Sequence, residues 1–176
     1  MFNEERDSPQ FDWNQLGDII WGRPILGSRT TVMAYRLMQF TLRDAMIRHV
    51  GVELANRIFY EAGQQAGKAM YQQLAAPEDF THFVQQLTDL LEEQSIGLLK
   101  VEKADLDNNR FTLTVAEDLD CSGLPESNEM LCTFDEGLLA GLFAAYLGDD
   151  FMVKETDCWC TGDRVCRFEV KPVKAP

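Results

Sequence analysis

The stretch from Cys132 to Cys166 constrains the fold most, because it spaces thiols and a carboxylate in the way that ligands of a metal ion are spaced. Cys132 stands immediately before a segment with helical features. Glu155, Cys158 and Cys166 lie on the segment Phe151–Val170, whose side chains alternate as in a β-hairpin. A hairpin can gather its three side chains around one ion, and the start of the helix then supplies a fourth.

Glu155 is the most informative of these residues. The alternation predicts that it shares a strand face with Phe151 and Val153. A carboxylate on an apolar face is unfavourable unless a cation compensates its charge, and thiolates with one carboxylate are an acceptable tetrahedral set for zinc. The sequence therefore predicts a zinc site, which is structural because no coordination position is left open; its ligands are Cys132, Glu155, Cys158 and Cys166.

Two alternatives remain open for the cysteines. They can be inert core residues, since a free cysteine is among the most buried side chains. A site made of thiolates alone can use Cys160 in place of Glu155, although Cys158-x-Cys160 is a tight spacing for two ligands of one ion. Cys121 and Cys160 otherwise read as plain thiols.

Composition limits the classes of partner. The 176 residues suggest one domain, and a net charge of −13 with no basic cluster argues against nucleic acid and against anionic membranes. No apolar run approaches the roughly 20 residues of a membrane span, and the N-terminal MFNEERDSPQ is not a signal peptide. We expect a cytosolic protein, in which five cysteines favour metal ligation over disulfides.

The remaining segments predict helices in the first half of the chain and a hairpin after them. Gly63-x-x-x-Gly67 lies in the strongest helical pattern and lets another backbone approach closely. In chain order we expect a loose tail over 1–10, a short helix from about Phe11 to Gly22, a strand at Thr30–Leu37 (or an earlier start of the next helix), helices at Phe40–His49, Val52–Leu74 and Pro77–Gly97, and a hairpin at Leu99–Val115 that turns at Asp107–Asn109.

A further helix is expected at Thr133–Leu147. Thr133 and Glu136 have the spacing of a capping box, and Gly148 is a natural stop. The elements together indicate an α+β domain of four or five helices packed on an antiparallel sheet.

The residues of the last third resemble the vinyl-4-reductase domain, which is also the sensory region of phenol- and aromatic-responsive bacterial activators. The matching pattern is Cys132-x-x-x-x-Gly137-x-x-x-Gly141, then Gly148, Glu155-x-x-Cys158, Gly162-Asp163 and Cys166-x-Phe168. The resemblance is specific over Cys132–Val170 and extends from about Thr30 to the end of the chain. It implies residues 30–176 as the domain, a zinc subdomain at 132–170, and residues 1–29 as a tail with a short helix.

The resemblance also implies a fold, a site and an assembly. The fold is the ligand-binding type shared with haem-based nitric-oxide sensors and vesicle-tethering subunits, and members tend to form homodimers. Three cysteines and one glutamate hold zinc in the phenol sensors, in the order of Cys132, Glu155, Cys158 and Cys166. The implied wall of a ligand pocket is formed by Phe111, Leu113, Leu142 and Val153, with His82 near the position of a polar histidine.

The pocket predicts the class of ligand. Leu113 stands where the phenol sensors carry a tryptophan, so a more apolar ligand than phenol is expected. His49 lies at an expected helix end near Gly51, where it can interact with the last carbonyl groups, and nothing else marks a haem pocket.

The sequence thus favours a zinc-stabilised domain that binds a small apolar or aromatic molecule and acts as a sensor or carrier through a partner chain. Candidate partner surfaces are the helix with Gly63 and Gly67 and the segment with Trp13 and Trp21. One alternative is an enzyme or accessory factor in tetrapyrrole vinyl reduction, although no nucleotide-binding glycine fingerprint or nucleophile–base constellation supports catalysis. Another is a redox sensor that uses Cys121 or Cys160.

Overall fold

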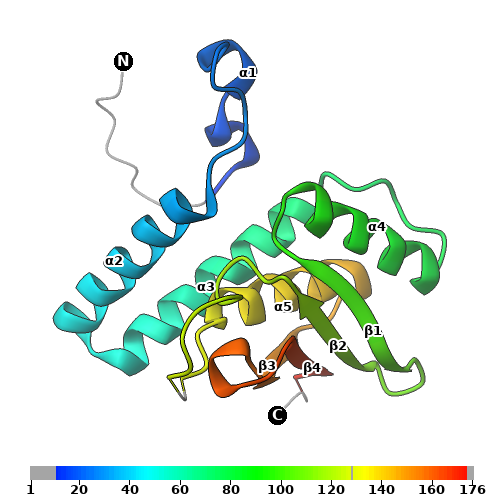
Figure 1. Cartoon of the computed structure of the whole chain (residues 1–176). Coiled ribbons are helices and arrows are strands. Elements are labelled where there is room, and N and C mark those ends of the chain that lie inside the picture. Colours follow the sequence, from blue (N-terminus) through cyan, green and yellow to red (C-terminus); the bar gives the residue numbers. More distant parts are fainter. Residues whose placement is uncertain (1–10, 128, 174–176) are drawn as a thin grey trace.

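The structure is a computed structural model that describes residues 11–127 and 129–173. Within these ranges the chain forms a four-stranded antiparallel sheet and five α-helices, which confirms the predicted α+β class (Figure 1). The predicted loose tail, residues 1–10, lies outside the described residues. The elements are α1 (Ile19–Gly22), α2 (Val32–Val50), α3 (Val52–Tyr71), α4 (Phe80–Glu93), β1 (Leu98–Asp105), β2 (Arg110–Ala116), α5 (Thr133–Leu147), β3 (Phe151–Asp157) and β4 (Cys166–Pro172), with 3-10 turns at Trp13–Leu16 and Trp159–Thr161.

The strands run in the order β1-β2-β4-β3, so the two predicted hairpins join through β2 and β4. Phe111 and Val153 both pair with Val170, while Glu155 pairs with Phe168. Alternate residues of β3 are buried, and Glu155 is one of them, as the alternation predicted. The inner face of the sheet is therefore apolar except where β3 contributes this carboxylate.

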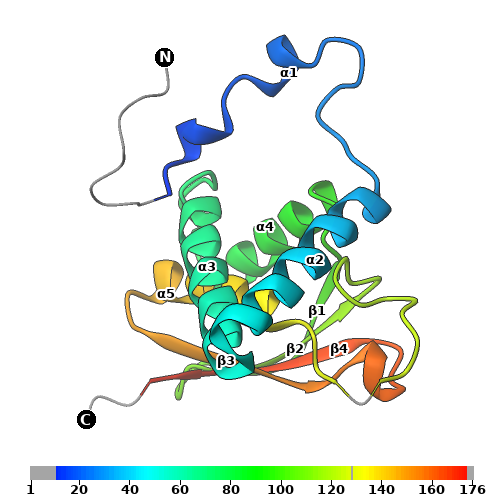
Figure 2. The same ribbon diagram turned by 90° about the vertical axis from the view of Figure 1, so that its left-hand side faces the viewer.

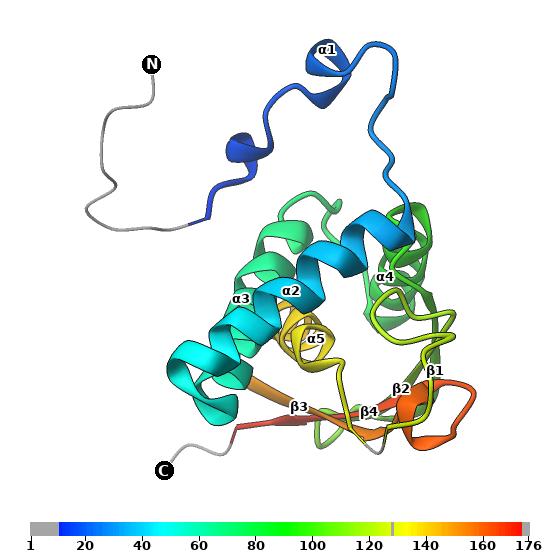
Figure 3. The ribbon, with the colours of Figure 1, turned by 60° about the vertical axis from the view of Figure 1, so that its left-hand side comes forward.

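α5 is the central helix, between the sheet and α3 (Figures 2 and 3). Every residue from Asp135 to Phe143 is buried, as expected of a helix enclosed on all sides. Close packing of α5 on α3 depends on glycine. A Cβ atom at Gly63 or Gly67 would lie 2.1 Å from a backbone carbonyl oxygen of α5. The predicted close approach of a backbone is confirmed, and this face of α3 is a contact within the chain, so it is not the suggested partner surface.

α4 covers the end of the sheet opposite to the cysteines and supplies aromatic side chains (Figure 1). Phe80 stacks on Phe111 with ring centroids 4.8 Å apart, and Phe83 meets Phe143 edge to face at 5.4 Å. Pro77 precedes this helix instead of lying in its first turn, because Asp79 provides the N-cap and accepts a hydrogen bond from the His82 backbone N–H.

The predicted strand at Thr30–Leu37 is wrong, since these residues begin α2. The Thr31 hydroxyl accepts a hydrogen bond from the Ala34 backbone N–H and caps that helix. Only Gln39 is buried among its 19 residues, whereas apolar side chains such as Met33 face solvent. The order of apolar residues in α2 therefore does not follow burial, and its β-branched and aromatic residues favoured a strand.

The N-terminal segment also differs from the expected single amphipathic helix. It forms the turn Trp13–Leu16 and the four-residue α1, and it extends away from the body of the molecule (Figures 2 and 3). Gly17 separates the two turns with a positive φ of 68°, which ends the first one. Among the described residues, no helix combines the length and apolarity needed to span a bilayer.

The capping box predicted at Thr133 is also wrong. Cys132 occupies the N-cap, and its carbonyl accepts a hydrogen bond from the Glu136 N–H. The Glu136 carboxylate turns instead toward β3, where it accepts hydrogen bonds from Lys154 Nζ and from the Glu155 backbone N–H, both at 2.8 Å. The predicted stop is confirmed, because Gly148 ends α5 in the left-handed conformation.

Candidate metal centre

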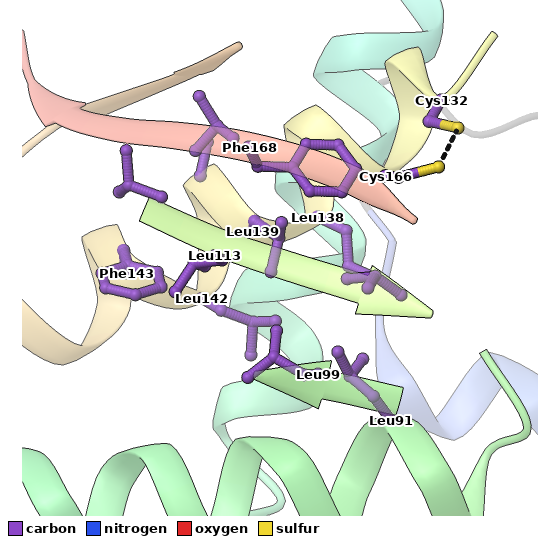
Figure 4. Packing of buried hydrophobic residues seen from close by; sticks show 14 of the residues in the cluster. Leu91, Leu99, Leu113, Cys132, Leu138, Leu139, Leu142, Phe143, Cys166 and Phe168 are labelled. Atoms are coloured by element: carbon purple, nitrogen blue, oxygen red, sulfur yellow. Dashed lines mark hydrogen bonds between the residues drawn. The ribbon is translucent and has the colours of Figure 1, made fainter. Parts of the chain in front are cut away.

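Four buried cysteines from four parts of the chain converge at the N-terminal end of α5. Cys132 is the N-cap of α5, Cys166 is the first residue of β4, Cys158 follows β3, and Cys121 lies in the loop after β2. Their Sγ atoms all lie within 4.8 Å of one another. Figure 4 shows Cys132 and Cys166 facing each other at one end of the hydrophobic core.

The distances between these sulfur atoms fit a shared metal ion. Cys132 Sγ lies 3.7 Å from Cys166 Sγ and 4.0 Å from Cys158 Sγ, while Cys121 Sγ lies 3.1 Å from Cys166 Sγ. Two thiolates on one tetrahedral zinc ion, each bonded at about 2.3 Å, are separated by about 3.8 Å. The first two distances match that separation, and the third is shorter. The buried cysteine cluster is thus consistent with a metal site.

Glu155 is buried beside this cluster and lacks a partner for its charge. It is 2 % exposed, and neither carboxylate oxygen has a hydrogen-bond partner. Burial, together with the negative charge of Cys158, raises the pKa of Glu155 to about 8. A cation in the cluster would remove this penalty, so the donor chemistry of Glu155 suits the metal that the sequence predicts.

Cys121 is the member of the cluster that sequence reasoning missed. Asp118 holds it in place, because its Oδ1 accepts hydrogen bonds from the backbone N–H groups of Asp120 and Cys121 at 2.9 and 3.1 Å. An aspartate followed by a short polar turn is a sequence signal for such a loop, and it was available here. Cys160, which the thiolate-only alternative would use, is buried but is not one of the four clustered residues.

The predicted pocket residues lie further along the same core. Phe111, Leu113, Leu142 and Val153 are all buried with the aromatic side chains of α4 and α5, and Figure 4 shows Leu113 and Leu142 between the sheet and α5. Val153 also lines an open groove of about 400 Å³ beside Tyr60. His82 lies on the outer side of α4, where its Nδ1 accepts from the Glu78 N–H and its Nε2 lies 3.1 Å from Gln86 Nε2.

An antiparallel α+β domain with a thiol cluster at the start of its central helix defines a class of protein, and comparison with known families identifies it. Residues 111–172 match the family model of the vinyl-4-reductase domain, so this part of the chain is a domain of that family. The match contains β2, α5, β3 and β4, and with them Cys121, Cys132, Glu155, Cys158 and Cys166. The resemblance inferred from the sequence is confirmed.

A relative in an archaeon covers more of the chain. The uncharacterized protein MJ1642 of Methanocaldococcus jannaschii is 27% identical over 149 residues, which are 84% of this chain and 81% of that protein. A solved vinyl-4-reductase family protein from the same organism has a TM-score of 0.61 and 19% identity, over 89% of this chain and 91% of that one.

Other solved structures are similar in fold. The phenol-responsive sensory domain of the activator PoxR, with phenol, has a TM-score of 0.65 at 16% identity, over 81% of this chain and 75% of that one. A trafficking protein particle complex subunit 3 from Naegleria fowleri, covalently bound to palmitic acid, scores 0.65 at 12% identity over 81% and 95% of the two chains. An H-NOX protein from S. oneidensis scores 0.54 at 16% identity over 85% and 80%. The predicted shared fold is confirmed.

Proposed function

We propose that this chain is a metal-stabilised domain that binds a small apolar or aromatic molecule and acts as a sensor or carrier through a partner chain. The observation that carries the proposal is the buried cysteine cluster at one end of a core whose other end is aromatic. One helix joins the two ends, because α5 begins next to Cys132 and carries Leu142 and Phe143 at the aromatic end.

The metal in this proposal is zinc, with the thiolates of Cys132, Cys158 and Cys166 as three ligands. Glu155 is the fourth, which is supported by its burial without any hydrogen-bond partner for either oxygen. Zinc prefers thiolate sulfur, accepts carboxylate oxygen and takes four ligands in structural sites. Bound there, it would stabilise the junction of α5 with the β3–β4 hairpin. Cys121 adds a fifth donor beside this set.

The ligand in this proposal is held between α5 and the sheet, against Phe111, Leu113, Leu142 and Val153. Proteins of similar fold support an apolar guest, since PoxR is described with phenol and the Naegleria subunit with palmitic acid. All four wall residues here are apolar and buried, and both polar ring atoms of His82 already have partners on or beside α4. Hydrocarbon-like ligands therefore suit this core better than phenol.

A partner surface is part of the same proposal. α2 exposes apolar side chains, among them Met33 and Leu37, and the N-terminal segment exposes Trp21 at 84 %. Exposed apolar groups of this size are typical of association surfaces. We propose residues 30–176 as the binding domain, and the α2 face with the N-terminal segment as the region through which a homodimer or another chain is contacted.

Native mass spectrometry of untagged protein purified without chelator tests this function. The proposal expects bound zinc and, in part of the population, an added mass that dissociates under denaturing conditions. Toluene and phenol, added separately to ligand-free protein, should bind with toluene the tighter of the two. Absence of zinc, or failure of both compounds and of any copurified molecule to bind, would contradict it.

A further inference from the structure

The buried metal-ligating groups at the start of α5 are more numerous than one tetrahedral ion can use. The four clustered cysteines and Glu155 already supply five donors. Asp118 and Asp135, 1 % and 6 % exposed, lie against the same cluster and bring the number to seven. One zinc ion takes four ligands, so at least three ionisable groups are left buried without a metal.

Two of the surplus groups form a second group of possible ligands with a cysteine of the first. Ligand atoms of Asp118, Cys132 and Asp135 all lie within 4.8 Å of one another, and Cys132 Sγ lies 3.8 Å from Asp118 Oδ1. Cys132 therefore belongs to both groups. A thiolate sulfur has enough lone pairs to bond two ions at once, so its position allows it to bridge them.

The two aspartates of this second group have oxygen atoms with no partner. Asp118 Oδ1 accepts two backbone N–H bonds, whereas its Oδ2 has none, and Asp135 Oδ2 has none either. Buried carboxylate oxygens are nearly always satisfied by a donor or a cation. These two orphan oxygens come from different elements, the loop after β2 and the first turn of α5, and both aspartates lie beside Cys132.

Positive side chains do not compensate these carboxylates. Within residues 11–127 and 129–173, no ion pair includes Asp118 or Asp135. The nearby Arg36 of α2 spends its guanidinium on backbone carbonyls, donating to Leu119 O at 2.8 Å and to Ser122 O at 2.9 Å. Lys154 is paired with Glu136. The excess negative charge therefore calls for a second cation.

We propose that the domain holds a second divalent ion, bound by Asp118, Asp135 and the thiolate of Cys132, which bridges it to the first. This inference rests on the thiolate site of the proposed function. Two carboxylate oxygens and one sulfur suit a borderline ion such as zinc, whereas calcium and magnesium prefer oxygen alone. The second ion fastens the loop after β2 to the start of α5, and it leaves the hairpin ligands to the first.

Metal counting on the full chain tests the second ion. Protein is loaded with excess zinc, separated from free metal, and measured by elemental analysis and native mass spectrometry. We expect two zinc ions per chain in the wild type and one in Asp118→Asn and in Asp135→Asn. Asp120→Asn is the matched control, a buried carboxylate of the same loop outside the group, and it should keep two. Circular dichroism checks that each variant is folded.

The zinc count distinguishes the second ion from the proposed function on which it rests. One zinc ion in the wild type under excess zinc overturns the second site and leaves the first intact. No zinc overturns both. If either aspartate variant is unfolded, cobalt titration of the wild type decides. The electron paramagnetic resonance signal should rise with the first equivalent and fall with the second, because a thiolate bridge couples the two ions. A signal that rises through both equivalents overturns the bridge.

Discussion

The Sγ atom of Cys121 lies 3.1 Å from that of Cys166, although 45 residues separate them in the chain. Register explains part of this contact, because Val115 near the end of β2 pairs directly with Cys166 at the start of β4. The loop that follows β2 turns back over this pair under the control of Asp118. A metal in the cysteine cluster would therefore join three parts of the fold, which are the loop, the start of α5 and the β3–β4 hairpin.

Cys166→Ser should remove the metal and destabilise the domain. Apparent binding free energies of structural zinc are on the order of 10 kcal/mol, and most of that contributes to folding, so we expect a loss of at least about 3 kcal/mol. Elemental analysis and urea unfolding measure the two effects. Cys160→Ser is the control, since Cys160 is equally buried but lies outside the cluster. Full zinc and unchanged stability in Cys166→Ser would show that the cysteines are ordinary core residues.

Glu155→Gln and Cys121→Ser should differ in zinc affinity. If Glu155 is the fourth ligand, its amide variant loses an anionic donor and should bind zinc at least about tenfold more weakly in competition with a chelator. This change corresponds to about 1.4 kcal/mol. Cys121→Ser should lose less affinity. The reverse order would identify Cys121 as the fourth ligand and Glu155 as a buried neighbour.

Much of the hairpin half of the molecule could be predicted, because there the chain pattern follows burial. β3 alternates as the sheet requires, so the inward position of Glu155 followed from Phe151 and Val153. The bounds of α5 agree as well, since Gly148 must end the helix. Cys132, Cys158 and Cys166 converge because a helix start and a hairpin are neighbours in space.

The parts that could not be predicted depend on long-range contacts or on solvent. α2 exposes its apolar residues, so periodicity does not reveal it. Glu136 leaves the predicted capping box because Lys154 and the Glu155 N–H offer it better partners across the sheet. Cys121 reaches the cluster only through the pairing of β2 with β4, and no local spacing records that pairing.

Stability of the metal-free protein should fall as the pH rises from about 5 to about 8. The folded state keeps the proton of Glu155 up to a pKa of about 8, while the unfolded state loses it near 4.5, so the folded state binds more protons across this window. Asp118, with its pKa raised to about 6 mainly by burial, acts in the same direction at lower pH.

Urea unfolding in the presence of chelator at pH values of about 5, 6.5 and 8 measures this dependence. Glu155→Gln should flatten the part at the higher pH values, and zinc-loaded protein should show the opposite slope, because metal binding requires deprotonated ligands. Chelated wild type that is as stable at the highest pH as at the lowest would contradict the role given to Glu155.

Gly67→Ala should destabilise the domain by forcing α3 away from α5. The new Cβ would lie 2.1 Å from the Leu138 carbonyl oxygen, and backbone on both sides leaves nothing flexible to move. Overpacking of this kind costs about 2–3 kcal/mol. Gly22→Ala is the control, because no atom outside its own helix lies within 4 Å of the place that the new methyl group would take, and α1 is exposed. Equal thermal unfolding midpoints for the two variants would contradict the close helix contact.

Leu142→Ala should alter ligand binding without altering the metal. Leu142 is fully buried between α5 and the sheet, so its truncation should cost about 2–5 kcal/mol and leave a cavity. That cavity should tighten binding of toluene, measured by calorimetry, while the zinc content stays at the wild-type value. Val52→Ala, at a half-exposed position on α3, provides the control. Unchanged toluene binding in Leu142→Ala would place the pocket elsewhere.

X-ray absorption at the zinc edge of protein purified without chelator tests the metal centre most directly, because it reports the atoms bonded to the metal. We expect a coordination sphere dominated by sulfur at about 2.3 Å, with a smaller oxygen contribution at about 2.0 Å from carboxylate. Oxygen and nitrogen neighbours alone, or protein that contains no zinc, would contradict a metal centre built on Cys132, Cys158 and Cys166.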